Sequence, residues 1–340
     1  MNIRLPAEWE PQDGVLLAWP HAATDWSDQL TEVLPVYLEL IRQITRFEQV
    51  LLVTPDPDAT RATLTSAGLE LARVTICEAA TNDTWTRDSG PITVLVNDTP
   101  VLLDFGFNGW GLKFAADQDN QLTRALKQQG AFRPRVNTIG LILEGGSIES
   151  DGAGTILTTS QCLLSPNRNP QLNAEEIEGA LRSLLGARQV HWLHHGHLAG
   201  DDTDAHIDTL ARLCPNDTIV HLGCEDPADE HYTALQEMRT ELEALRTTQG
   251  TPYRLLPLPW PQPAYAADGH RLPATYANYL VINGAVLVPT YRDPADNGAL
   301  AMLALAYPER EIIGIDCLPL IRQHGSLHCI TMQLPEGVLP

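Results

Sequence analysis

The chain has 340 residues, with 43 acidic against 22 basic side chains and a formal net charge of −21. Such a field repels nucleic acid and anionic membranes and favours a cationic substrate, although a surface that only confers solubility gives the same balance. Residues 1–6 run into charged residues without an apolar signal segment, and the longest apolar run, 299–307, is too short to span a bilayer. Six cysteines without a C-x-x-C pair then predict free thiols in a reducing cytoplasm.

Short apolar runs alternate with helical patterns along the chain. The first strand is predicted at 14–19, followed by a helix from an N-cap at Ser27 to about Phe47, which Pro35 bends or delays. Further helices are predicted at about 57–67, 117–129, 173–185, 230–248 and 294–306. Further strands are predicted at 49–54, 92–96, 101–105, 155–158, 189–193, 218–222, 276–282, 285–289 and 311–315. The Pro-rich segment 251–263 is expected to be a loop over the site or a linker.

The five helices from 57–67 onward recur at intervals of roughly 60 residues, with short β-like runs between them. This spacing predicts an α/β protein built from five repeated βαβ-rich units in a radial or stacked arrangement. No change in composition marks a domain boundary, so residues 1–340 are expected to form a single catalytic domain.

Reactive side chains recur at nearly the same phase after four of these helices: Asp88, Glu144, His206 and Cys329. The fourth unit offers no comparable residue. If 205–210 is extended, His206 and Asp208 project from one face. In a closed radial fold, equal phase predicts that these groups converge on the axis.

Each candidate also has a structural interpretation. Cys329 alone is typical of buried packing, Asp88 could cap a turn or pair with Arg87, and His328 is expected to serve packing or orientation rather than act as the base. Asp201 and Asp202 are expected to be solvated. An alternative metal site joins these aspartates to three neighbouring histidines, which are His194, His195 and His197. Glu144 in apolar surroundings is harder to explain structurally, because a buried carboxylate without a partner is costly.

One thiol, one imidazole and several carboxylates suit a guanidinium substrate. A guanidinium is planar and cationic, and its forked N–H donors bind carboxylates bidentately. A thiolate can attack its carbon once that carbon is held and polarised. Surrounding carboxylates raise the pKa of a thiol, so the cationic substrate itself would help to expose the thiolate.

Several motifs together resemble the agmatine deiminase family of the guanidino-modifying (pentein) superfamily, over nearly the whole chain. They are NDTWTRDSGP, LDFGFNGWG, LEGGSIESDG, TTSQCLLSPNRNP, GDDTDAHID, LPATYANYLVIN and GSLHCIT. The resemblance implies a five-bladed α/β propeller of ββαβ repeats. This chain departs from the family pattern in three places. His-Gly-Ser-Leu precedes His-Cys where several glycines and an Asn are usual, Ala205 replaces the usual Gly, and Glu149 stands where a His is common.

The resemblance also implies roles for individual residues. Cys329 is the expected nucleophile, His206 the general acid and base, and Glu144 the support of His206 or of the substrate. Asp88 and Asp208 are expected to grip the guanidinium. Trp85 is expected to wall the aliphatic part of the substrate, and Asp204 is a further substrate-binding candidate.

The expected reaction is agmatine plus water to N-carbamoylputrescine and ammonia, through an amidino-cysteine intermediate and without a metal or organic cofactor. The alternative within this class is deimination of arginine or of arginine residues in peptides. Two other classes stay open: a metal-dependent amidinohydrolase and a non-catalytic polyamine-binding protein. The expected partner is a small cationic guanidino compound, with no nucleic acid and no membrane. A homodimer is one option for the assembly, which the residues do not decide.

Overall fold

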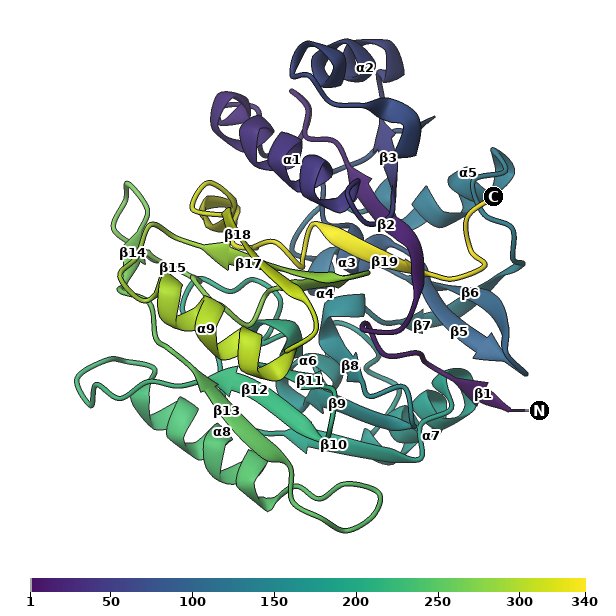
Figure 1. Ribbon diagram of the computed structural model, residues 1–340. Coiled ribbons are helices and arrows are strands. Elements are labelled where there is room, and N and C mark those ends of the chain that lie inside the picture. Colours follow the sequence, from purple (N-terminus) through teal and green to yellow (C-terminus); the bar gives the residue numbers. More distant parts are fainter. Residues whose placement is uncertain (1) are drawn as a thin grey trace.

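The structure, a computed structural model, describes residues 2–340 as a mixed α/β fold of small sheets with helices outside them (Figure 1). The helices are α1 (Leu30–Ile44), α2 (Pro57–Ser66), α3 (Thr86–Ser89), α4 (Gly109–Leu112), α5 (Leu122–Gln128), α6 (Ser160–Leu163), α7 (Ala174–Leu185), α8 (Tyr232–Ala244) and α9 (Asp296–Ala306). In Figure 1, α2 and α8 lie at opposite ends of the molecule. Between residues 2 and 340 no helix is long and apolar enough to cross a membrane.

Five sheets share one pattern: an antiparallel pair of strands, then a parallel neighbour reached through a helix. In order of their strands, the sheets are β19 (Thr331–Pro335)–β2 (Gln12–Ala18)–β3 (Gln49–Thr54)–β4 (Val74–Glu78); β1 (Ile3–Arg4)–β5 (Ile92–Val96)–β6 (Thr99–Gly106)–β7 (Val136–Ile142); β8 (Ile148–Ser150)–β9 (Thr155–Thr159)–β10 (Gln189–Leu193); β11 (Ala211–Cys214)–β12 (Thr218–Leu222)–β13 (Arg254–Leu258); and β16 (Leu280–Ile282)–β17 (Ala285–Thr290)–β18 (Glu311–Asp316). A separate hairpin joins β14 (Ala264–Tyr265) to β15 (Arg271–Leu272).

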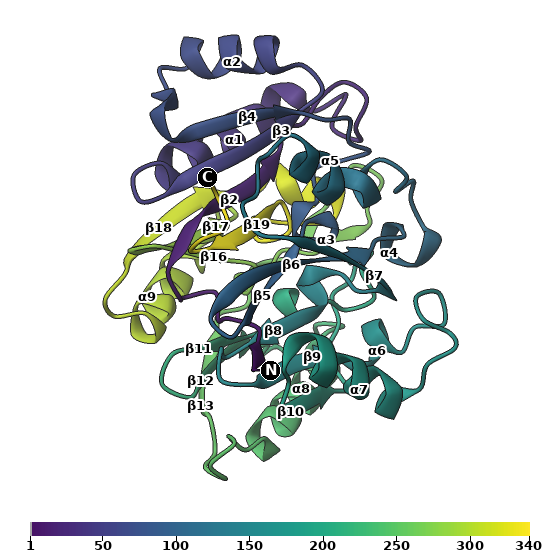
Figure 2. The ribbon, with the colours of Figure 1, turned by 90° about the vertical axis from the view of Figure 1, so that its right-hand side faces the viewer.

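The two ends of the chain meet in the first of these sheets, where β19 runs antiparallel to β2 (Figures 1 and 2). Both strands are almost wholly buried: β2 carries the apolar run 15–18, and in β19 only Gln333 is partly exposed. This pairing brings the segment before β19 next to α3, where the Thr86 hydroxyl donates to the carbonyls of Leu16 and Ile330. The N-terminal and C-terminal parts of the chain therefore build the same region.

Local sequence explains the best-formed helix. Asn173 caps α7 by accepting the N–H of Glu176, whose carboxylate accepts the N–H of Asn173 in return, a capping box. The helix ends at Gly186, whose φ of 74° is the left-handed conformation that glycine adopts without a steric penalty. Ile177, Leu181 and Leu185 form its buried face.

Several predicted boundaries were wrong. The first helix begins at Leu30, where Gln29 and not Ser27 is the N-cap, and it continues through Pro35. The helix predicted at 117–129 is a 3₁₀ turn at Asp119–Gln121 followed by α5, the one at 230–248 shrinks to Tyr232–Ala244, and the strand at 276–282 shrinks to Leu280–Ile282. The segment 251–263 contains strand β13 and is not simply a loop. It lies at the edge of its sheet, where Pro257 removes no necessary ladder bond.

In each of the five sheets, the segment that leads into one strand of the antiparallel pair supplies one residue to a common region. Asp88 precedes β5, Glu144 precedes β8, His206 precedes β11, and Cys329 precedes β19. The remaining sheet, which begins with β16, is entered through Asn278. Asn278 binds the Cys329 thiol but is not a reactive side chain of the kind that the other four units supply, and its uncharged amide carries no signal of reactivity in a sequence.

Candidate active site

A cavity of about 520 Å³ opens beside Cys329. This volume lies in the range of sites for small molecules. Of the predicted residues, Cys329, Asp88 and Trp85 line it directly. The aromatic rings of Trp110 and Phe114 line it as well, together with Asp25, Asp83, Asp119, Asp202, Thr203 and His324.

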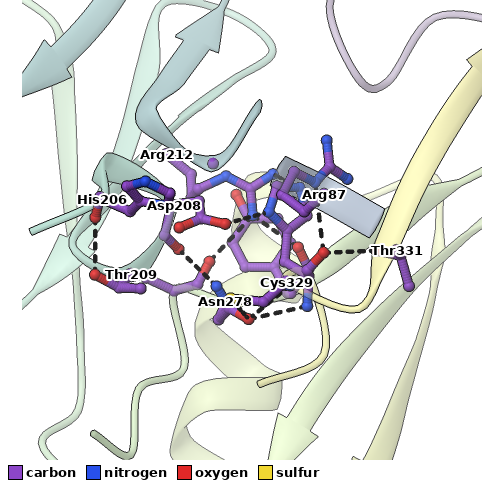
Figure 3. A network of polar contacts seen from close by, with 12 residues as sticks. Arg87, His206, Asp208, Thr209, Arg212, Asn278, Cys329 and Thr331 are labelled. Carbon is purple, nitrogen blue, oxygen red and sulfur yellow. Dashed lines mark hydrogen bonds and ion pairs between the residues drawn. The ribbon is translucent and has the colours of Figure 1, made fainter. Parts of the chain in front are cut away.

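Cys329 lies in a tight turn before β19. The N–H and hydroxyl of Thr331 both donate to the carbonyl of His328, and the N–H of Arg87 donates to the carbonyl of Cys329 (Figure 3). Its thiol donates to Asn278 Oδ1 at 3.3 Å, and the same oxygen accepts the backbone N–H groups of His328 and Cys329. Burial raises the pKa of the thiol well above its usual value, and Asp208 and Asp88 raise it further. The free protein therefore holds a protonated thiol.

Asp88 lies on α3 and has both carboxylate oxygens engaged. The N–H of Gly146 donates to Oδ1 and the indole N–H of Trp110 donates to Oδ2, both at 2.9 Å. Burial raises the pKa of Asp88, and the nearby His206 opposes this rise. Trp110 was not predicted, although it belongs to the LDFGFNGWG motif.

His206 lies between two carboxylates. Its Nδ1 is 3.6 Å from Asp88 Oδ1, and its Nε2 is 3.2 Å from Glu144 Oε2. Burial alone would lower the pKa of His206, but Asp88, Cys162 and Glu144 raise it well above the usual value. The ring is therefore charged at neutral pH. Residues 207–209 form a 3₁₀ turn (η4), so the predicted extended geometry of this segment was wrong.

Glu144 lies beneath His206, fully buried. Arg168 Nε donates to its Oε2 at 2.7 Å, and the Cys162 thiol approaches the same oxygen at 3.7 Å. Burial would raise the pKa of Glu144, but His206 and Arg168 outweigh it and lower the pKa. Arg168 and Cys162 both lie in the TTSQCLLSPNRNP motif, and neither was singled out from sequence.

Asp208 completes the group. Its Oδ2 accepts His328 Nδ1–H at 2.7 Å, as expected of a histidine with an orienting role. Burial would raise the pKa of Asp208, but His328 lowers it. Within residues 2–340, Asp208 Oδ1 and His206 Nδ1 are buried without a hydrogen-bond partner. Unpaired buried polar atoms on two residues that flank Gly146 indicate a position that a polar ligand can satisfy.

Gly146 shows how closely these groups converge. A Cβ placed on it would lie 2.6 Å from His206 Nδ1, 2.9 Å from Asp88 Oδ1 and 3.0 Å from Asp208 Oδ2. Three side chains from two segments, the one that leads into β5 and the one that leads into β11, thus surround one glycine. Only a residue without a side chain leaves them room.

Other predicted residues lie elsewhere. Asp204, like His206, Asp208 and Glu144, is not among the cavity-lining residues. Its carboxylate pairs with Lys113 at 2.7 Å and Arg168 at 2.6 Å, so its place in substrate binding stays a prediction. Asp201, expected to be solvated, instead accepts the N–H and hydroxyl of Thr203 and the N–H of Ala205.

The three histidines of the alternative metal site do not act together. His194 contacts the Ser160 hydroxyl, His195 pairs with Glu241, and His197 lies against the His231 ring. Their neighbours are therefore different elements of the fold.

These groups define a mixed α/β protein whose buried thiol, imidazole and carboxylates surround a site for a flat cation. Residues 4–335 match the family model of the Porphyromonas-type peptidyl-arginine deiminases. The chain belongs to that family.

Three relatives show the range of similarity. The agmatine deiminase of Stutzerimonas stutzeri (strain A1501) is 32% identical over 97% of this chain and 95% of that protein. A solved Porphyromonas gingivalis protein, provisionally assigned as an arginine deiminase, is 48% identical with a TM-score of 0.94, covering 99% of this chain and 100% of that chain. A cysteine-to-serine variant of C. jejuni agmatine deiminase with substrate bound is 40% identical with a TM-score of 0.92, covering 98% and 97%.

Proposed function

We propose that this protein hydrolyses agmatine to N-carbamoylputrescine and ammonia through a covalent intermediate on Cys329. The observation that carries the proposal is the convergence of His206, Asp88 and Asp208 around Gly146, next to the thiol that lines the cavity. A guanidinium held there would give Asp208 Oδ1 the donor that it lacks in the free protein. The similarity to agmatine deiminases agrees with this choice.

The chemistry follows from the protonation states. The arriving cation offsets the carboxylates that raise the pKa of Cys329, so the thiol releases its proton to solvent. The thiolate attacks the guanidinium carbon, and the charged His206 donates its proton to the departing nitrogen, which leaves as ammonia. The neutral His206 then takes a proton from water as the oxygen attacks the same carbon. Collapse expels the Cys329 thiolate, which takes up the remaining hydroxyl proton to restore the thiol, and releases the carbamoyl product.

The lining of the cavity favours a substrate with two positive charges. Five aspartates line it, and across residues 2–340 no lysine or arginine does. Burial raises the pKa of Asp83 to about 7, helped by Asp25 and Asp119, and burial also raises the pKa of Asp119 to about 7. Both therefore gain charge as the pH rises through neutrality. The distal ammonium of agmatine would be stabilised there, whereas the carboxylate of free arginine would have no cation to meet.

The fold supports the same interpretation. We infer that residues 1–340 form one catalytic domain and that the five ββαβ units close into a five-bladed propeller around the site. The support is the repeated strand order and the delivery of one site residue from the segment entering each sheet. In the reaction as written, side chains of this chain supply the nucleophile, the acid and the base, so it requires no metal or organic cofactor.

Deimination of arginine residues in peptides is the second candidate, because the family description names that reaction and a blocked arginine carries no free carboxylate. Ammonia release should be measured with agmatine, free arginine and a blocked arginyl peptide. We expect agmatine to have the highest kcat/KM, and absence of agmatine turnover would refute the proposal. A chelator should spare the activity and a thiol alkylator should abolish it; the reverse result would favour a metal-dependent amidinohydrolase. If Cys329→Ala binds agmatine but the natural protein turns over no substrate, a polyamine-binding protein is the better description.

A further inference from the structure

We propose that Glu8 and Arg212 are positioning residues that hold His328 as a charged imidazolium, which keeps Asp208 ionised and aimed at the guanidinium. This inference rests on the proposed function, because Asp208 is taken as a substrate-gripping carboxylate. It adds a residue from the first ten of the chain to a site whose nucleophile lies near the other end.

The ring of His328 lies between two carboxylates. Its Nδ1 is 2.7 Å from Asp208 Oδ2, and its Nε2 is 2.8 Å from Glu8 Oε2. A carboxylate only accepts hydrogen bonds, so both ring nitrogens must carry protons to satisfy both neighbours. A neutral ring would leave either Glu8 or Asp208 facing a nitrogen lone pair in a buried position, which is costly.

Glu8 is itself fixed in place. Its Oε1 accepts the N–H of Val281 at 2.7 Å, and its Oε2 accepts Arg212 Nη2 at 2.6 Å. Arg212 Nη2 also lies 3.1 Å from His328 Nε2, but Glu8 is closer. Of Arg212 and Glu8, only Glu8 can accept a hydrogen bond from a protonated Nε2. Burial would raise the pKa of Glu8, but His328 and Arg212 lower it well below its usual range.

The guanidinium of Arg212 has partners at its nitrogens and against its face. It pairs with Glu149, donates to the carbonyls of Ala277 and Tyr279 at 3.1 and 2.7 Å, and packs over the Tyr279 ring at 4.5 Å. Figure 3 shows it next to Asp208 in the polar network. A guanidinium with so many fixed partners is a rigid anchor for Glu8.

Five charged side chains surround His328. Glu8, Asp208 and Glu149 are negative, and Arg212 and Arg87 are positive, with Arg87 Nε donating to the His328 carbonyl at 3.4 Å. Together with a charged His328 they form three positive and three negative groups, so the buried set is balanced without substrate. Glu8, Arg212, His328 and Asp208 are all absent from the lining of the large cavity, and of these four Asp208 is the one that reaches the Gly146 position. Glu8 and Arg212 therefore act on the substrate through His328 and Asp208.

The test is Glu8→Gln. The amide oxygen can still accept the N–H of Val281, while the NH₂ group faces His328 Nε2. Because this NH₂ group donates, Nε2 becomes an acceptor and no longer carries a proton. Asp208 then loses its cation and its pKa rises. The KM for agmatine should rise by roughly tenfold to a hundredfold, by analogy with the loss of the outer carboxylate partners of metal-bound histidines. The kcat should change little, because the lost contact acts on bound substrate and transition state alike.

The acid limb of kcat/KM should also move to higher pH by at least about one unit, since Asp208 must be ionised to bind the cation. Glu48→Gln is the matched control: this buried carboxylate likewise accepts a backbone N–H, from Asn283, but does not face His328. His328→Gln should show the same change as Glu8→Gln, and the double variant should be no worse than either alone. Additive losses would overturn the proposal.

A readout without turnover separates this inference from the proposed function. ¹⁵N-histidine NMR of the unaltered protein, assigned with His328→Gln, should show protons on both ring nitrogens of His328 at pH 7. Glu8→Gln should remove the proton on Nε2. A singly protonated His328 in the unaltered protein would overturn the inference even if agmatine is turned over. Absence of agmatine turnover with a doubly protonated His328 would overturn the function alone.

Discussion

Gly146→Ala tests the geometry of the site with a single methyl group. The new Cβ would lie 2.6, 2.9 and 3.0 Å from His206, Asp88 and Asp208, against about 3.4 Å for an ordinary contact. The three groups must therefore retreat by about 0.8, 0.5 and 0.4 Å. Each is held in a buried network, so they cannot all move freely. A misplacement near 1 Å costs on the order of a hundredfold in rate.

We expect kcat/KM for agmatine to fall by at least about a hundredfold, while overpacking costs roughly 1–3 kcal/mol of unfolding free energy. Steady-state ammonia release gives the first quantity and urea unfolding the second. Gly140→Ala is the control, because its Cβ would meet nothing within 4 Å. If Gly146→Ala retains full activity, the three groups do not surround the reacting position and the mechanism is wrong.

Three further predictions follow from the same contacts. Glu144→Gln removes a negative charge 3.2 Å from His206 Nε2. The attraction between the two charges is at most about 5 kcal/mol at an effective dielectric constant of 20. The pKa of His206 should therefore fall, and the basic limb of the kcat/KM profile should move down by at least about one pH unit. An unmoved limb would exclude His206 as the acid. Burial raises the pKa of Cys329, so neutral iodoacetamide at pH 7 should alkylate it at least about tenfold more slowly than free cysteine and faster as the pH rises, read by peptide mass mapping; equal rates would contradict a protonated thiol. Ala205 has a φ of 63°, so Ala205→Gly should relieve backbone strain of about 1–2 kcal/mol. The greater flexibility of glycine in the unfolded chain costs about 0.5–1 kcal/mol, so the urea midpoint of unfolding should rise slightly. A lower midpoint would contradict this.

The sequence was sufficient to predict the order of strands and helices, but not all of their boundaries and not the edge strand β13. Apolar strands such as 49–54 and 218–222 were predicted at their observed bounds because burial on both faces leaves a continuous apolar run. Strand β13 was missed because Pro257 and its neighbours read as a loop, while an edge position tolerates proline. Edge position is a tertiary property that local sequence does not record.

The residues that converge in the structure were predicted because their reactive chemistry is visible in their identity. Their supports were not, since Glu8, Arg212 and Asn278 gain meaning only from contacts with residues far along the chain. Ala205 gave a usable local signal: it stands where the family usually has glycine, and the structure shows the left-handed backbone that explains the preference. The pairing of Asp204 with Arg168 was not predicted, because a carboxylate next to a reactive histidine looks the same in sequence whether it binds substrate or an internal arginine.

Intact mass of the protein, acid-quenched within the first turnovers of agmatine, is the most direct test of covalent catalysis. We expect a species heavier by agmatine less ammonia, mapped to Cys329 by peptide analysis and absent from Cys329→Ser. Turnover with no adduct at any quench time, or with the adduct on another cysteine such as Cys162, would contradict the nucleophile on which the mechanism rests.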